Sequence, residues 1–397
     1  MHGIISAIIG IVLCLTVMVS PAAGRHEPEL TGHVSSAKEI LDAMRPLPPG
    51  AEISIDHLFA FAATPPRLAF NPAREVALVN FVAKACGEDS GWKPASRAGA
   101  EGAAYVVTID APLSRYLQLN FNPGIPDYAV FPASLRYSTC ADSNAMSCVY
   151  SAINTGPTGA LQVVTGRVTG REEITPNPES GSYFSYTTSR VFIRGAVGGR
   201  DVLFSCAETT GPSTLSNRGV LVGPLDQALF YYSEKPGLNL SGMTWMTSQI
   251  MHSTTLSVYI ALTSNTTAVA SFAWLNAGWK GLNVTRSKHI LNSQKTTLDF
   301  SRKIAQDQRI TPEGLTTLVS TVAAMPDSRV NGDYGKYLGY VKAERERCKS
   351  GLFAPSSLLE DLYDEKASES IAQPYRRALV IQERVRGLLG IPTWSKK

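Results

Sequence analysis

The 397-residue sequence contains none of the short motifs that define the common catalytic folds. It has no GxSxG elbow, no HExxH zinc motif, no Walker phosphate loop and no GxGxxG dinucleotide turn. It also has no CxxC pair and no cysteine–histidine spacing that suits zinc, so we expect neither a metal nor a cofactor. Any catalytic site would therefore have to be assembled from residues that are distant in the sequence.

Excess charge of one sign is also missing. The 37 Lys and Arg residues and 33 Asp and Glu residues leave a formal net charge of +4. Because no strong positive field surrounds the molecule, nucleic acid is not an expected partner. The hydrophobic fraction of 44% and the charged fraction of 18% are typical of a globular protein and not of a disordered one.

Beyond residue 24, no stretch is apolar enough to span a bilayer. Residues 4–19 are apolar, and the small-residue segment SPAAG that follows them suits signal-peptide cleavage. No Lys or Arg precedes the apolar run, so an uncleaved N-terminal anchor is the alternative. We predict a signal peptide over residues 1–24 and a soluble, exported protein, periplasmic or extracellular, with no transmembrane segment after its removal.

Cysteine is scarce, with six in the chain, and Cys14 lies in the predicted signal peptide. Of the other five, Cys140 and Cys148 enclose a polar segment, and Cys206 ends an apolar strand pattern. In an oxidising compartment we expect a disulfide among Cys140, Cys148 and Cys206. An odd number leaves at least one thiol over, which we expect to be buried and inert.

The hydrophobic periodicity divides the mature chain into three segments. Residues 25–104 carry helical patterns and end in an aperiodic stretch, expected to be a mobile loop. Residues 105–285 alternate apolar and polar side chains, as in "RYLQLNF" and "TLSVYIALT", which predicts antiparallel strands. Residues 286–397 are helical again. We predict an α+β fold with a central antiparallel β-rich sandwich or open barrel, flanked by N-terminal and C-terminal helical segments.

Two sequence signals predict the starts of helices in the flanking segments. Asn71-Pro72 and Thr311-Pro312 each place a capping side chain before a proline, which is favoured at the first helical position. A further helix is expected to begin near Pro374.

The segments "VTGRVTGRE" and "YFSYTTSRVFIR" predict a β-hairpin rich in arginine. A turn over residues 176–181 would place Arg171 opposite Tyr186 and bring four arginines to one face. The residues of this predicted face are Arg167, Arg171, Arg190 and Arg194, with Tyr186 between them. Because arginine binds phosphate, sulfate and carboxylate bidentately, the face predicts binding of an anionic polysaccharide, a lipid headgroup or a protein partner. The alternative is a solvated hairpin whose arginines are neutralised elsewhere, since a slip of one residue separates them.

The segment "AWLNAGWKGLNVTRSKHI" (residues 273–290) is the second candidate site. Its first ring, Trp274, is expected in the core, and the chain is expected to leave the strand at residues 276–278. The amides and the indole that follow could bind a sugar or a small polar ligand: Asn276, Trp279, Lys280 and Asn283. The alternative is a strand-to-helix corner whose polar side chains satisfy the backbone. His289 is a weak candidate for a general base, against a structural role at a helix start.

The C-terminal segment is basic. Residues 366–397 hold seven Lys or Arg and two Glu, which gives 7 − 2 = +5. Such a helix could lie on an anionic membrane or bind an assembly partner through residues 373–390. The alternative is a packed helix with a solvated basic face.

These observations favour a non-catalytic binding or envelope-associated protein for an anionic or sugar-like ligand. The first alternative is a secreted hydrolase with a site near His289. The second is a structural or assembly partner that uses the basic C-terminal helix.

Overall fold

The computed structural model describes nine ranges of the chain: residues 44–63, 70–88, 90–154, 164–178, 180–224, 227–239, 245–279, 281–348 and 371–394. The predicted signal peptide, with Cys14, and Lys280 lie outside the described residues. The described ranges belong to one compact unit. Within these ranges, no helix combines the length and the apolar character needed to cross a bilayer.

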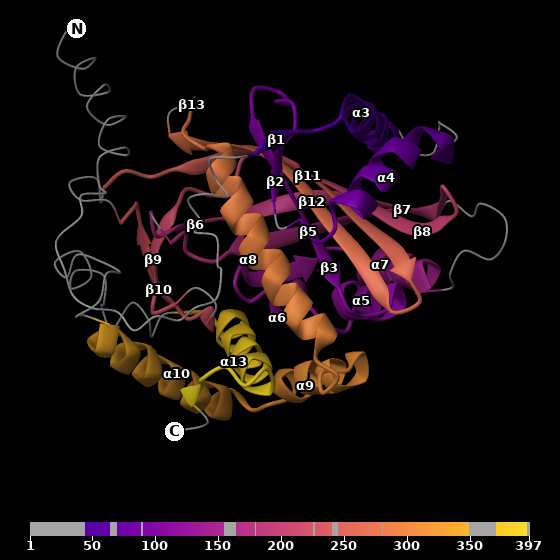
Figure 1. Cartoon of the computed structure of the whole chain (residues 1–397). Helices are drawn as coiled ribbons and strands as arrows, with labels where there is room; N and C mark the ends of the chain where they lie inside the picture. The colour runs from indigo at the N-terminus through magenta and orange to yellow at the C-terminus, as the bar shows by residue number, and fades with distance from the viewer. Residues whose placement is uncertain are drawn as a thin grey trace, which may run out of the picture. The chain divides into compact units, whose positions relative to one another are not determined.

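A mixed sheet of ten strands lies at the centre of the described structure (Figure 1). In spatial order the strands are β1 (Arg45–Pro46), β2 (Gly91–Lys93), β3 (Glu101–Ile109), β12 (Thr266–Trp279), β11 (Gln249–Thr263), β8 (Arg200–Thr209), β7 (Ser185–Val197), β5 (Val164–Ile174) and β4 (Leu135–Cys140), with β13 (Leu282–Asn283) paired to β12. The β1–β2 pair is parallel, and the other pairs are antiparallel. A small second sheet has the order β10 (Phe230–Pro236), β9 (Asn217–Leu221) and β6 (Ser182–Tyr183).

Helices cover both faces of the large sheet. One face packs against α3 (Pro49–Ala63), the 3₁₀ helix η1 (Pro72–Glu75) and α4 (Val76–Ala85). The other core contains α5 (Leu113–Asn120), α6 (Asp127–Val130), α7 (Ser143–Asn154), α8 (Ser287–Gln306), α9 (Pro312–Ala323), α10 (Asp327–Cys348) and α13 (Gln373–Leu388). Along β11, Leu256, Val258 and Ile260 face the first core and Tyr259 faces the second, because side chains alternate along a strand.

The predicted α+β class is confirmed, with a large mixed sheet flanked by helices. The sheet is not a closed barrel, because its edge strands β1 and β4 do not pair with each other. The sandwich is not confirmed, since both faces of the sheet pack against helices.

Some local predictions are wrong. "RYLQLNF" belongs to helix α5, because Leu113, Tyr116, Leu117 and Asn120 are buried at helical spacing. The segment expected to be a mobile loop contains β2 and the start of β3.

Both caps are confirmed. The side chain of Asn71 accepts the Ala73 N–H at 3.1 Å, and that of Thr311 accepts the Gly314 N–H at 3.0 Å. The last helix begins at Gln373, next to the predicted Pro374. These predictions succeeded because a cap depends only on neighbouring residues.

The β5–β7 hairpin has a register one residue away from the predicted one. Arg171 lies opposite Thr187, not Tyr186, and Arg167 lies opposite Val191. The connection is longer than a tight turn, because residues 182–183 form β6 and pair with β9. Arg167 and Arg171 therefore lie on one face of the sheet and Arg190 and Arg194 on the other. The prediction of a four-arginine face is wrong.

Candidate ligand-binding site around Arg136

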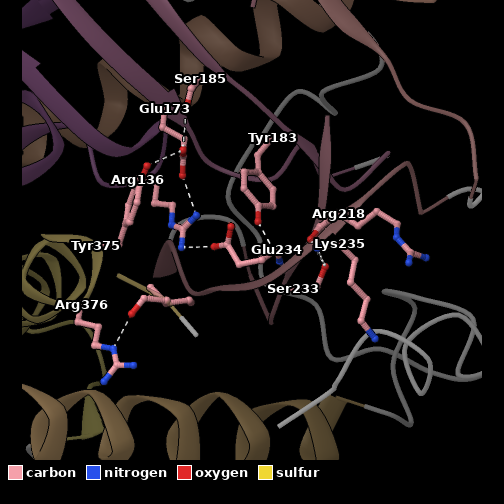
Figure 2. Close-up of polar contacts among 11 residues, drawn as sticks. Arg136, Glu173, Tyr183, Ser185, Arg218, Ser233, Glu234, Lys235, Tyr375 and Arg376 are labelled. Atoms are coloured by element: carbon pink, nitrogen blue, oxygen red, sulfur yellow. Dashed lines mark hydrogen bonds and ion pairs between the residues drawn. The ribbon is translucent and has the colours of Figure 1, made fainter. Parts of the chain in front are cut away.

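A buried arginine near the start of β4 links the large sheet to the small one (Figure 2). The Arg136 side chain is 1% exposed. Its Nη1 donates to Oε1 of Glu173 at 2.7 Å, and its Nη2 donates to Oε1 of Glu234 at 2.6 Å. A buried guanidinium without counter-charges would cost several kcal/mol, so these two carboxylates hold the charge in place.

Three tyrosine rings surround the guanidinium. Its central carbon lies 4.1 Å from the ring centroid of Tyr232, 4.3 Å from that of Tyr375 and 5.5 Å from that of Tyr183. Although burial opposes the charged form, the attraction of Glu173 and Glu234 raises the pKa of Arg136 above its ordinary value. We call these six residues (Arg136, Glu173, Tyr183, Tyr232, Glu234 and Tyr375) the arginine cage.

Glu173 is the fixed carboxylate of the cage. Its Oε2 accepts hydrogen bonds from Ser185 Oγ at 2.6 Å and from the Tyr375 hydroxyl at 3.1 Å. Its side chain is buried among β5, β7 and α13. Glu173 therefore has partners on both of its oxygens and is firmly positioned.

Glu234 is held more weakly. Its side chain is 32% exposed, and its backbone has a φ of +55°, a left-handed conformation that costs a non-glycine residue about 1–2 kcal/mol. The pairing of β10 with β9 is irregular between Tyr232 and Pro236, which includes this residue. The Glu234 N–H donates to the Tyr183 hydroxyl at 3.1 Å, as Figure 2 shows. Glu234 is thus the cage carboxylate that can reach solvent.

Two polar groups of the cage have unused hydrogen-bonding capacity. Arg136 Nε and the Tyr232 hydroxyl are buried, and neither has a hydrogen-bond partner among the described residues. Groups of this kind normally bond to protein, water or a ligand. Glu234 occupies only Nη2, although a carboxylate can accept from Nε and Nη2 of one arginine together. The cage is therefore suited to hold a carboxylate through two hydrogen bonds in place of the single one that Glu234 makes.

The hairpin arginines on the Arg190 face have acidic partners. Arg190 Nη2 donates to Glu172 at 2.9 Å, and its Nη1 lies 3.7 Å from Asp127. The Tyr186 hydroxyl donates to the same Glu172 at 2.9 Å. Arg194 pairs with Asp201 through Nε at 3.1 Å and Nη2 at 2.6 Å. These contacts neutralise both arginines inside the protein.

The other two hairpin arginines are exposed. Arg167 donates to Ser189 Oγ at 2.9 Å and to the Ala62 carbonyl at 2.8 Å, while Arg171 lies at the surface. The structure favours the neutralised-hairpin interpretation, because the four guanidinium groups do not converge. Their role in binding an anion stays a prediction.

The second candidate site, residues 273–290, contains one tryptophan ring in the core and one that is half-buried. Trp274 is fully buried and donates from Nε1 to the Ala95 carbonyl at 2.7 Å, which confirms its place in the core. The expected strand break at residues 276–278 is wrong, since β12 continues to Trp279 and is stabilised by β13. Asn283 supports this corner, because its Oδ1 accepts the N–H groups of Ala277 and Thr285 at 3.2 and 3.0 Å.

His289 lies in the first turn of α8. Its Nδ1 accepts the backbone N–H of Arg286 at 3.4 Å, as in a helix cap. This contact favours the structural interpretation. A catalytic role for His289 stays a prediction. Within the described ranges, no three acidic, cysteine or histidine side chains are placed to hold a metal ion.

The basic C-terminal helix is packed against the protein. Arg386 is buried and pairs with Glu383 at 2.7 Å. Arg377 donates to the carbonyls of Val322 and Met325, at the end of α9, and to Asp327 at 2.6 Å. These arginines serve internal contacts, which favours the packed-helix interpretation over a membrane-bound one.

The four cysteines with described side chains are free thiols: Cys86, Cys140, Cys148 and Cys206. The disulfide expected among Cys140, Cys148 and Cys206 is not formed. Cys206 is buried in the core beneath α3, whereas Cys140 and Cys148 are exposed.

We expect a thiol reagent to modify Cys140 and Cys148 rapidly in the native protein and Cys206 only after unfolding. Burial raises the pKa of Cys206 to about 12, so very little reactive thiolate is present near neutral pH. Mass spectrometry of peptides from the native, labelled protein measures this difference. Rapid native labelling of Cys206, or protection of both Cys140 and Cys148 that a reductant removes, would contradict the structure.

The sequence did not indicate Arg136 as a site residue. Glu173 and Glu234 lie 37 and 98 positions away in the chain, so no local spacing connects them. The only usable signal was the Glu172-Glu173 pair, whose side chains point apart on the strand and bind Arg190 and Arg136. In comparisons with protein-family models, curated proteins and solved structures, nothing matched this chain.

Proposed function

We propose that this protein is an exported, non-catalytic binding protein for a small ligand that carries a carboxylate group. The observation that carries this proposal is the unused hydrogen-bonding capacity of Arg136 Nε and of the Tyr232 hydroxyl, together with the partial exposure of Glu234, which pairs with the same guanidinium. In the bound state, the ligand carboxylate replaces that of Glu234 and accepts from both Nε and Nη2 of Arg136. The Tyr232 hydroxyl donates to the same ligand.

Replacement of the Glu234 carboxylate by that of the ligand keeps the charge balance of the cage. One carboxylate replaces another, so the charge next to Arg136 does not change and Glu173 stays paired. A bidentate contact is stronger than the single Nη2 contact that Glu234 makes. When Glu234 leaves, its strained backbone can also relax.

The test is a calorimetric titration with acetate, succinate and citrate, each compared with its neutral amide. We expect a carboxylate to bind and its amide not to bind. Glu234→Gln should lower the dissociation constant about tenfold, because a competing carboxylate is removed. Tyr232→Phe should raise it about tenfold without lowering the melting temperature, since the hydroxyl has no partner in the described structure.

Glu313→Gln, an exposed glutamate on α9, is the matched control and should bind as the wild type does. Equal affinity for acids and amides would contradict the proposal. So would a Glu234→Gln variant that loses binding although it is folded.

A second candidate is a neutral sugar at the end of β12. Asn276 Oδ1 is buried without a hydrogen-bond partner among the described residues, and the half-buried Trp279 follows on the same strand. A buried amide oxygen suits a sugar hydroxyl and an indole suits the face of a sugar ring, although these two side chains point to opposite faces of the strand. A calorimetric response to neutral sugars that Trp279→Ala removes would support this candidate.

A further inference from the structure

A second buried carboxyl group lies far from the arginine cage, beneath the N-terminal helices. The Glu75 side chain is 0% exposed and lies where η1 meets α4. Its Oε1 is hydrogen bonded to Nδ1 of His57 on α3. Its Oε2 is buried, with no hydrogen-bond partner in the described ranges. A carboxyl group that joins two helices through one bond, and has one oxygen unused, is poorly prepared to carry a charge.

Few charges face this carboxyl group. His57 faces it from α3, and Arg74 adjoins it on η1 and acts on both residues. From β8, the Cys206 thiol faces the Glu75 carboxyl group. The charges of Arg97 and Glu208 also act on the pKa of this thiol. From β5, the guanidinium of Arg167 reaches this side of the sheet and donates to the Ala62 carbonyl near the end of α3. The hydrophobic side chains that β7, β11 and β12 contribute to this core are Val191, Ile193, Val197, Leu256, Val258, Ile260, Ala268, Ala270, Phe272 and Trp274.

We propose that the His57–Glu75 pair is a pH-sensitive latch that holds α3 and α4 on the sheet when Glu75 is protonated and loosens them when it ionises. The neutral carboxyl group fits the buried site, because one hydrogen bond joins it to His57. The carboxylate would keep a buried, unsolvated oxygen, and opening the helices lets water reach it.

The direction of the pH dependence follows from the pKa values. Burial raises the pKa of Glu75 from 4.5 to about 8, although Arg74 opposes the shift. When α3 and α4 are packed on the sheet, Glu75 therefore keeps a proton that it releases when they loosen. The free energy that favours the packed state falls as the pH rises towards 8 and changes little above it. Burial lowers the pKa of His57, which opposes this trend only below its ordinary value of 6.5. The effect of Glu75 alone is visible between pH 6.5 and 8.

Hydrogen exchange of the whole protein tests the latch. After correction for the intrinsic exchange rate, the protection of amides in residues 49–63 and 76–85 should fall almost tenfold per pH unit near pH 7 and more slowly close to pH 8, about 15-fold in all between pH 6.5 and 8. Residues 287–306, the helix α8 on the opposite face of the sheet, provide the internal reference.

Glu75→Gln keeps the shape of the side chain and removes the titration, so its protection should not change with pH over this interval. Glu88→Gln, an exposed glutamate just after α4, should behave as the wild type does. If Glu75→Gln does not fold, His57→Gln is tested instead. This variant removes the hydrogen bond between the imidazole and Glu75, so the protection of the amides in residues 49–63 and 76–85 should be lower at pH 6.5. A fall in protection that is equal in wild type and Glu75→Gln, or equal in α8, would overturn the proposal.

Discussion

Arg136→Met should lower the free energy of unfolding by about 3–5 kcal/mol, the usual loss when one partner of a buried ion pair is removed. The reason is that Glu173 would remain buried without its counter-charge, although Ser185 and Tyr375 still donate to it. Urea denaturation at pH 7, followed by circular dichroism, measures this loss.

A double variant separates the loss of charge balance from the loss of packing. Arg136→Met with Glu173→Gln removes both charges, so we expect it to recover a large part of the stability lost in the single variant. Arg171→Met, on the neighbouring strand β5 but exposed, should change stability by less than about 0.5 kcal/mol. A single Arg136→Met variant as stable as the wild type would show that the cage is not the buried charge centre described above.

Trp274→Ala should cost about 3–5 kcal/mol, whereas Trp279→Ala should cost less than about 1 kcal/mol. Trp274 is fully buried beneath α3 and α4 and bonds to the Ala95 carbonyl. Trp279 is half-buried at the end of the same strand. Denaturation of both variants under one set of conditions gives the comparison, and similar costs would contradict the assignment of one ring to the core and the other to the surface.

Local signals in the sequence predicted local structure well. Asn71 and Thr311 cap helices as expected, and the alternation of Leu256, Val258 and Ile260 identified β11. Each of these features depends on residues within one turn of helix or one strand. The same alternation over "RYLQLNF" was misleading, because seven residues also fit two turns of a helix that is buried on several sides.

The hairpin shows why the candidate site was not predictable. The faces of Arg167 and Arg190 depend on a register that the sequence alone could not fix, because β6 lengthens the connection by pairing with a distant strand. Glu172 was visible as a charged neighbour, but its bond to Arg190 depends on the same register. The acidic partners of the arginines are therefore a consequence of tertiary structure.

The arginine cage lies still further from any local pattern. Arg136 meets Glu234 through an irregularity in β10, and Tyr375 approaches from the last helix. A lone arginine between Leu135 and Tyr137 gives no indication of these contacts. Only the packing of two sheets and a helix brings the cage together.

The most direct test of carboxylate binding is the nuclear magnetic resonance signal of the Arg136 Nε–H, assigned by its loss in Arg136→Lys. The account predicts that this signal moves downfield on addition of citrate or succinate and not of the corresponding amide, because a carboxylate accepts from Nε only in the bound state. It also predicts a larger shift at the same concentration in Glu234→Gln. A signal that stays in place while the carboxylate binds elsewhere would contradict the assignment of the arginine cage as the binding site.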